Sequence, residues 1–91
     1  MLVFFTCATS GPARRMESLL AHIARKERGR LHVRRVDADE HPRLIHKFGV
    51  EKVPALVLVI DGKVAGRIDG RANMPQIELL LEQHLAETVA A

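Results

Sequence analysis

The residues best placed to do chemistry lie near the start of the chain, in the run Phe4–Met16. Apolar, strand-like residues lead to Ser10, Gly11 and Pro12, and a helix is predicted to begin at Pro12. A helix N-terminus carries unpaired N–H groups and a partial positive charge, so it stabilises an anion or a thiolate placed there. The run therefore has the layout of a reactive site, although its only cysteine, Cys7, precedes the helix start.

Length and composition predict one domain with an ordinary core. The chain has 91 residues, of which 47% are hydrophobic, and this content argues against disorder. The formal charge of +3 is mild and the charges are interspersed, so we expect no nucleic-acid partner. No apolar run has the length of a membrane span, and no basic leader precedes a cleavage site. A single cysteine fits a reducing compartment, so we expect a cytoplasmic protein without a membrane partner.

The hydrophobic pattern predicts the order βαβαββα and one α/β domain over residues 1–91, with residues 87–91 as a frayed tail. We expect a small mixed sheet of four strands with helices on both faces. The strands are expected at Leu2–Thr6, Leu31–Val36, Ala55–Ile60 and Lys63–Ile68.

The helices are predicted from apolar spacing and end signals. In the first helix the apolar stripe recurs at helical spacing, and Gly29 is expected to close the helix. A short second helix is predicted with Asp39 as its N-cap, and the third with a capping box between Asn73 and Gln76. Asp61-Gly62 predicts a two-residue hairpin turn. The expected core positions of the first and third helices are Met16, Leu19, Leu20, Ile23, Ile77, Leu80, Leu81 and Leu85.

From Leu2 to about Leu85 the chain resembles the thioredoxin family. Ser10-Gly11-Pro12-Ala13 stands where the family has Cys-Gly-Pro-Cys, and Val53-Pro54-Ala55 stands where it has an apolar residue, a cis-proline and usually threonine. Phe48-Gly49-Val50, Asp61-Gly62 and Gly70 match at the family's spacing as well. The resemblance implies a thioredoxin fold and a place among proteins of thiol–disulfide exchange and cell redox homeostasis. It implies no cofactor.

The chain departs from the family at the residues that carry the chemistry. An attacking and a resolving thiol are needed for disulfide reduction, and Ser10 and Ala13 stand in these two positions. A serine hydroxyl is not ionised at neutral pH without a partnered base. Phe4 replaces the family's buried carboxylate, and Thr9 replaces its tryptophan. We therefore expect a chain of the disulfide-reductase family that cannot run the dithiol cycle as written.

Recognition of an extended peptide is the function that we expect to remain. The resemblance implies a cis peptide bond before Pro54, beside the helix start, where backbone groups are offered to an added strand. The partner would be a protein or peptide segment in extended form. The predicted groove consists of Thr9, Ser10, Gly11, Pro12, Val53, Pro54 and Gly70.

In two alternative hypotheses the chain is an active enzyme. In the first, Cys7 with Ser10 forms the Cys-x-x-Ser of a monothiol glutaredoxin-like oxidoreductase. Against this, the helix start lies too far downstream to activate Cys7 strongly, and a small half-buried cysteine is ordinary in a core. In the second, Ser10 and Ala13 are laboratory replacements in an active disulfide reductase, a question that the encoding gene would settle.

The remaining arginines and histidines give weaker indications of function. Arg14 and Arg15 with Ser10 are compatible with an anion site, but also with a solvated helix turn. None of the histidines has metal-ligand spacing with a partner, so no metal site is predicted. The strand Leu31–Val36 is expected at a sheet edge that its arginines protect, which allows a monomer or a weak dimer through that edge.

Overall fold

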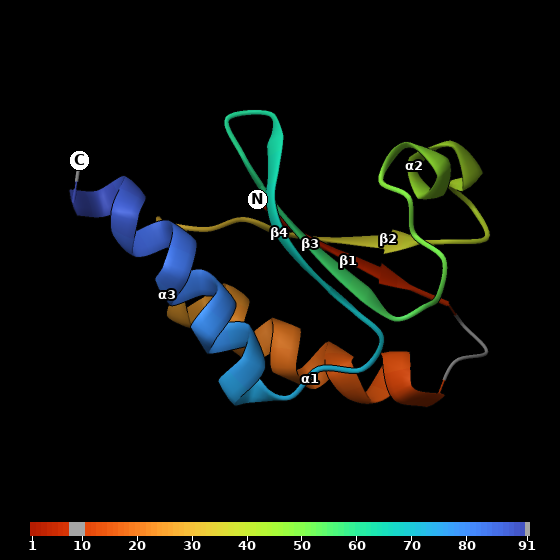
Figure 1. Cartoon of the computed structure of the whole chain (residues 1–91). Helices are drawn as coiled ribbons and strands as arrows, with labels where there is room; N and C mark the ends of the chain where they lie inside the picture. Colours follow the sequence, from red (N-terminus) through yellow and green to blue (C-terminus); the bar gives the residue numbers. More distant parts are fainter. Residues whose placement is uncertain (8–10, 91) are drawn as a thin grey trace.

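The computed structural model describes residues 1–7 and 11–90, and for residues 85–90 the backbone alone. Its elements follow the predicted order βαβαββα (Figure 1). They are β1 (Leu2–Thr6), α1 (Gly11–Lys26), β2 (Val33–Asp37), α2 (Pro42–Lys47), β3 (Ala55–Ile60), β4 (Lys63–Asp69) and α3 (Met74–Ala90).

The four strands form one mixed sheet in the order β2-β1-β3-β4. β1 pairs in parallel with β2 and antiparallel with β3, and β3 pairs antiparallel with β4. Helices α1 and α3 cover one face of the sheet, and α2 lies on the other (Figure 1). All five residues of β1 are buried because the strand is paired on both sides and covered on both faces. The predicted α/β class, with helices on both faces, is confirmed.

Side-chain alternation along β1 divides the core into two layers. Leu2 and Phe4 pack on the α1 and α3 side, whereas Val3 and Phe5 pack on the α2 side. The core stripe of α1 is confirmed, except that Leu19 is only partly buried. Of the core positions expected in the third helix, Ile77, Leu80 and Leu81 are buried. The side chain of Leu85 lies outside the description.

Close packing of α3 on β4 depends on Gly66, a residue that the sequence pattern does not distinguish from the rest of its strand. A Cβ atom at this position would lie 2.7 Å from Cδ1 of Leu80 and 3.0 Å from Nε2 of His84. Both distances are at or below the limit of real Cβ contacts, so any larger residue would displace the side chains of α3.

The predicted boundaries of β2, β4 and α1 differ from the structure by one or two residues. β2 begins at Val33 instead of Leu31 and ends at Asp37. The N–H groups of Arg30 and Leu31 both donate to the carbonyl of Glu27, at 2.9 Å each, and these bonds keep both residues in the turn that follows α1. Leu31 still buries its side chain in the core. α1 begins one residue earlier than predicted, at Gly11.

The prediction that Asp39 caps the second helix is wrong as well. α2 begins at Pro42 after His41, which makes no side-chain capping bond. The N–H of Asp39 instead donates to Oδ1 of Asp37 at 2.9 Å, so it is the Asp37 carboxylate that organises the turn between β2 and α2.

The hairpin turn and the start of the last helix are as predicted. Asp61 and Gly62 have φ angles of 53° and 77°, the left-handed backbone of a type I′ turn. Asn73 and Gln76 form a reciprocal capping box, each backbone N–H donating to the other's side chain at 2.9 Å. α3 extends to Ala90, and Ala91 lies outside the description, so the frayed tail at residues 87–91 stays a prediction.

Replacing Asn73 with alanine tests the capping box. We expect Asn73→Ala to lower the free energy of unfolding by about 1 kcal/mol, because the N–H of Gln76 loses its acceptor. Urea unfolding followed by far-UV circular dichroism measures this change. Asn73→Asp keeps the acceptor in place and should retain most of the stability, so an equal loss in both variants would contradict the capping role.

Candidate functional site

The predicted groove is only partly within the described structure. Thr9 and Ser10 lie outside the described residues. Gly11 and Pro12 are exposed in the first turn of α1, whereas Ala13 is completely buried and packs in the core. The first turn of α1 therefore presents Gly11 and Pro12 to the surface and directs the methyl group of Ala13 inward.

Strand register brings Pro54 and Gly70 to the end of β1. Phe5 is opposite Ala55, and Ala55 is opposite Asp69, so Pro54 and Gly70 both lie just beyond the paired strands at this end of the sheet. The N–H of Gly70 donates to the carbonyl of Pro54 at 2.9 Å. The Val53–Pro54 peptide bond is cis. Pro54 is itself buried, and Val53 and Gly70 are half-buried.

The backbone donor and acceptor of Val53 have no partner among the described residues. Within residues 1–7 and 11–90, neither its N–H nor its carbonyl forms a hydrogen bond. A half-buried residue with both groups unpaired, next to a sheet end, can pair with an extended chain as an added strand would. The resemblance placed Val53 in the predicted groove, and the course of the loop before β3 is what leaves these two groups without a described partner.

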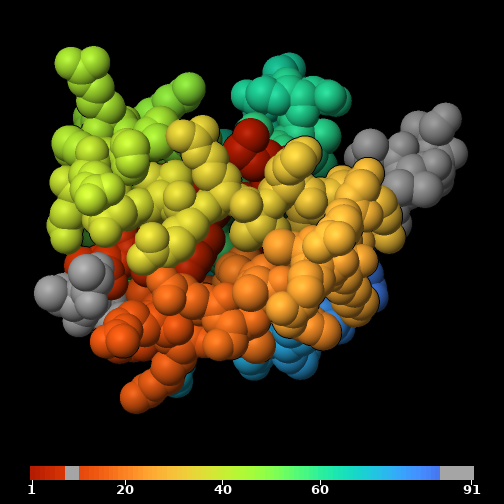
Figure 2. Space-filling model, turned by 180° about the vertical axis from the view of Figure 1, so that it is seen from behind, coloured from red at the N-terminus to blue at the C-terminus, as the bar shows by residue number. Residues whose placement is uncertain are grey.

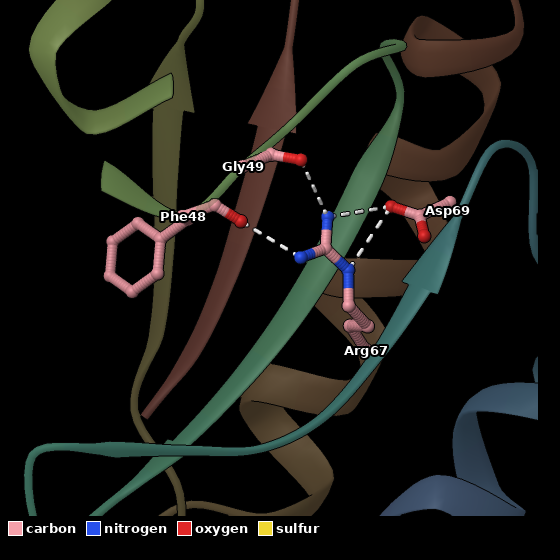
Figure 3. A network of polar contacts seen from close by, with 4 residues as sticks. All are labelled: Phe48, Gly49, Arg67 and Asp69. Carbon is pink, nitrogen blue, oxygen red and sulfur yellow. Dashed lines mark hydrogen bonds and ion pairs between the residues drawn. The ribbon is translucent and has the colours of Figure 1, made fainter. Parts of the chain in front are cut away.

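Arg67 holds this loop against β4 and was not among the predicted site residues. Its guanidinium donates to the carbonyl of Phe48 at 2.8 Å and to the carbonyl of Gly49 at 3.3 Å (Figure 3). Two further bonds, of 3.2 and 2.8 Å, join it to Oδ1 of Asp69. In the sequence Arg67 is one polar residue of an alternating strand, and no local signal distinguishes it from a solvated arginine.

Two charged grooves lie near Pro54 and Gly70. One, of about 420 Å³, is lined by Glu51, Lys52, Arg67 and Asp69, with the backbone of Gly49. The other, of about 400 Å³, lies between α1 and the segment after Gly70. Its lining residues are Arg15, Met16, Leu19, Arg71, Ala72, Asn73 and Gln76. An extended segment at Val53 would thus have charged grooves within reach.

Cys7 follows the end of β1 and is half-buried. Its thiol contacts Oδ2 of Asp39 at 3.5 Å, so the turn between β2 and α2 contributes a carboxylate beside it. Its neighbour Thr6 is completely buried, and the Thr6 hydroxyl has no hydrogen-bond partner among the described residues. The end of β1 therefore carries two side chains with polar or reactive atoms close to Pro54.

The described residues contain neither a metal-binding group of side chains nor a helix that could span a membrane. No group of three or more histidine, cysteine, aspartate or glutamate side chains there could hold a metal ion. No helix in the described part of the chain is long and apolar enough to cross a membrane.

Comparison with known proteins gives consistent matches. The family model "Thioredoxin" matches residues 1–83. Thioredoxin from Griffithsia pacifica is 30% identical over 90 residues, which are 97% of this chain and 81% of that protein. Thioredoxin 1 from Nostoc sp. is 27% identical over 85 residues, 93% of this chain and 79% of that protein.

A solved structure gives the same result. A mutant thioredoxin from Halobacterium salinarum superposes with a TM-score of 0.84 and 28% identity, covering 92% of this chain and 73% of that one. A malarial protein has the same TM-score at 19% identity and supports the fold alone.

Removing the Arg67 guanidinium tests its hold on the loop. We expect Arg67→Met, which loses all four hydrogen bonds, to lower the free energy of unfolding by about 1 kcal/mol and to raise amide exchange at Gly49 and Val50 about tenfold. Hydrogen exchange followed by NMR measures the local effect. Arg28→Met is the control, because Arg28 is exposed and its side chain makes no contact among the described hydrogen bonds and ion pairs. Equal exchange in both variants would contradict the role.

Proposed function

This chain belongs to the thioredoxin family, and we propose that it recognises extended polypeptide segments without running a dithiol cycle. The observation that carries the proposal is the cysteine count: the whole sequence contains one cysteine. Reduction of a substrate disulfide by a dithiol cycle consumes two thiols of the same chain, one to attack the disulfide and one to release the mixed disulfide. With one thiol the second step has no intramolecular nucleophile.

The proposal assigns the attacking position to Ser10 and the resolving position to Ala13. It is supported by the run Ser10-Gly11-Pro12-Ala13 at the start of α1 and by the burial of Ala13. A hydroxyl in the first position does not supply the thiolate that the reaction needs, and a methyl group in the second supplies no nucleophile at all.

Cys7 is a poor replacement for the missing thiols. It lies at the end of β1, before the helix start, and its sulfur contacts the Asp39 carboxylate. A thiol that acts as a nucleophile is normally placed beside cations or at a helix N-terminus. We therefore propose a structural role for Cys7.

Recognition is supported by the backbone of Val53, whose N–H and carbonyl have no hydrogen-bond partner among the described residues. An extended segment lying beside Pro54 can donate to the Val53 carbonyl and accept from its N–H, in the manner of strand addition. The bond from Gly70 to Pro54 and the Arg67 network fix the two ends of the Val53 segment, so the backbone is held in place before a partner arrives. Preorganisation of this kind lowers the entropic cost of binding.

Restoring the two thiols tests the missing chemistry. The unaltered chain should leave the rate of reduction of a protein disulfide by dithiothreitol at its uncatalysed value. The double variant Ser10→Cys with Ala13→Cys should accelerate the reaction, because the chain would then carry an attacking and a resolving thiol three residues apart in sequence. Turnover by the unaltered chain would overturn the proposal, and Cys7→Ser would show whether Cys7 is responsible.

A trapped adduct tests recognition separately. In a Cys7→Ser background, the single variant Ser10→Cys should exchange with a peptide carrying a pyridyl disulfide, releasing the pyridine thione and retaining the peptide by an S–S bond. We expect amide exchange at Val53 to slow about tenfold in the peptide adduct, because its N–H gains an acceptor. The matched control is an adduct with 2-mercaptoethanol, which has no peptide backbone. Equal exchange in the two adducts would contradict recognition at Val53.

A further inference from the structure

The outer side of β2 is an unpaired sheet edge at the opposite margin of the sheet from β4. In the sheet that the structure describes, β2 has a neighbouring strand on one side only. The carbonyl of His32 accepts from Leu2 at 2.7 Å, and the N–H of Ala38 donates to Thr6 at 2.8 Å. Because these groups alternate along a parallel strand, the N–H and C=O groups of Val33 and Arg35 point away from β1.

An apolar hollow lies beside this edge on each face of the sheet. On the α1 face the hollow has a volume of about 410 Å³, and Arg35 and Glu17 are its charged lining residues. On the α2 face it has a volume of about 190 Å³ with Arg34 and Lys47 at its margin. Figure 2 shows β2, coloured yellow, exposed between α1 and α2. The apolar lining comes from Phe4, Leu20, Val33, Val3, Val36, Leu44 and Phe48.

The charges at this edge are mainly positive. The side chain of Arg34 is exposed and forms no hydrogen bond or ion pair with any described residue. Arg35 donates through Nε to Glu17 at 2.9 Å, but its side chain remains 57% exposed, so its terminal nitrogens can still reach a partner. The ammonium of Lys47 lies 5.7 Å from the centre of the Phe48 ring, at the margin of the smaller hollow.

We propose that the β2 edge binds an extended, acidic segment of another protein, in addition to the recognition proposed at Val53. Such a segment would hydrogen-bond to the outward backbone groups of Val33 and Arg35 and send alternate side chains into the two hollows. Apolar side chains of the bound segment fill the two hollows. Its carboxylates pair with Arg35 on the α1 face of the sheet and with Arg34 on the α2 face.

The arginines of β2 also disfavour pairing of this edge with β2 of a second copy of the chain. Antiparallel self-pairing centred on β2 places Arg34 or Arg35 opposite or next to an arginine of the other copy, and like charges across a strand pair are destabilising. The arginines thus select the partner strand by charge as well as protecting the edge from self-association.

The test uses a short fluorescent peptide in which pairs of valines alternate with pairs of glutamates, so that each face of the extended peptide carries both residue types. On binding, amide exchange at Val33 and Arg35 should slow about tenfold, because both N–H groups gain acceptors. The amides of Arg34 and Val36 face β1 in the same strand and should not change. A peptide with lysine in place of glutamate should bind at least about fivefold more weakly.

Two charge-reversal variants distinguish binding at the β2 edge from general electrostatic attraction of an acidic peptide to a basic protein. Arg34→Glu should weaken the acidic peptide at least about fivefold and strengthen the lysine peptide. Arg28→Glu makes the same change in net charge at an exposed position outside β2 and should have little effect. Circular dichroism verifies that both variants are folded.

Three results would overturn the proposal. The first is unchanged exchange at Val33 and Arg35 with the acidic peptide in excess. The second is equal weakening by Arg34→Glu and Arg28→Glu, which indicates non-specific electrostatics. The third is a dimer in sedimentation, without peptide, in which Val33 and Arg35 are already protected, since the edge would then belong to a second copy.

Discussion

The pairing of β1 with strands on both sides is the constraint on which the rest of the structure depends. Leu2, Phe4 and Phe5 are at most 1% exposed, and they anchor the two core layers on opposite faces of the sheet. Antiparallel register with β3 then fixes Pro54 beside the end of β1, and the β3–β4 pairing brings Gly70 to the same place. The candidate site is thus a product of strand register, and its parts come from segments far apart in the sequence.

Elements with strong local signals could be predicted, and elements defined by distant contacts could not. β3 was found from its unbroken apolar run, and the Asp61-Gly62 turn and the Asn73 capping box were found because they depend on residues close in sequence. The predicted start of β2 was wrong because the N–H of Leu31 bonds back to the carbonyl of Glu27, and the predicted cap of α2 was wrong because the Asp37 carboxylate accepts from the N–H of Asp39. Arg67 was missed because its carbonyl partners lie 18 and 19 residues away in the chain.

The candidate site could likewise be predicted only in part from the sequence. The resemblance of the motifs led to Gly11, Pro12, Pro54 and Gly70, and the structure places Pro54 and Gly70 in direct contact. The resemblance also implied that backbone groups beside Pro54 are offered to an extended chain, and in the structure the N–H and carbonyl of Val53 have no partner among the described residues. The absence of a second thiol, in contrast, is a statement about the composition of the sequence and needs no structure.

The buried hydroxyl of Thr6 has a consequence for how the strand end is stabilised. A hydroxyl removed from water without a partner costs about 1 to 3 kcal/mol, and valine would occupy nearly the same volume without that cost. Among the described residues no hydrogen bond offsets this cost at the last residue of β1, one position before Cys7. This weakness is local, because the remaining four residues of the strand are wholly apolar and tightly packed.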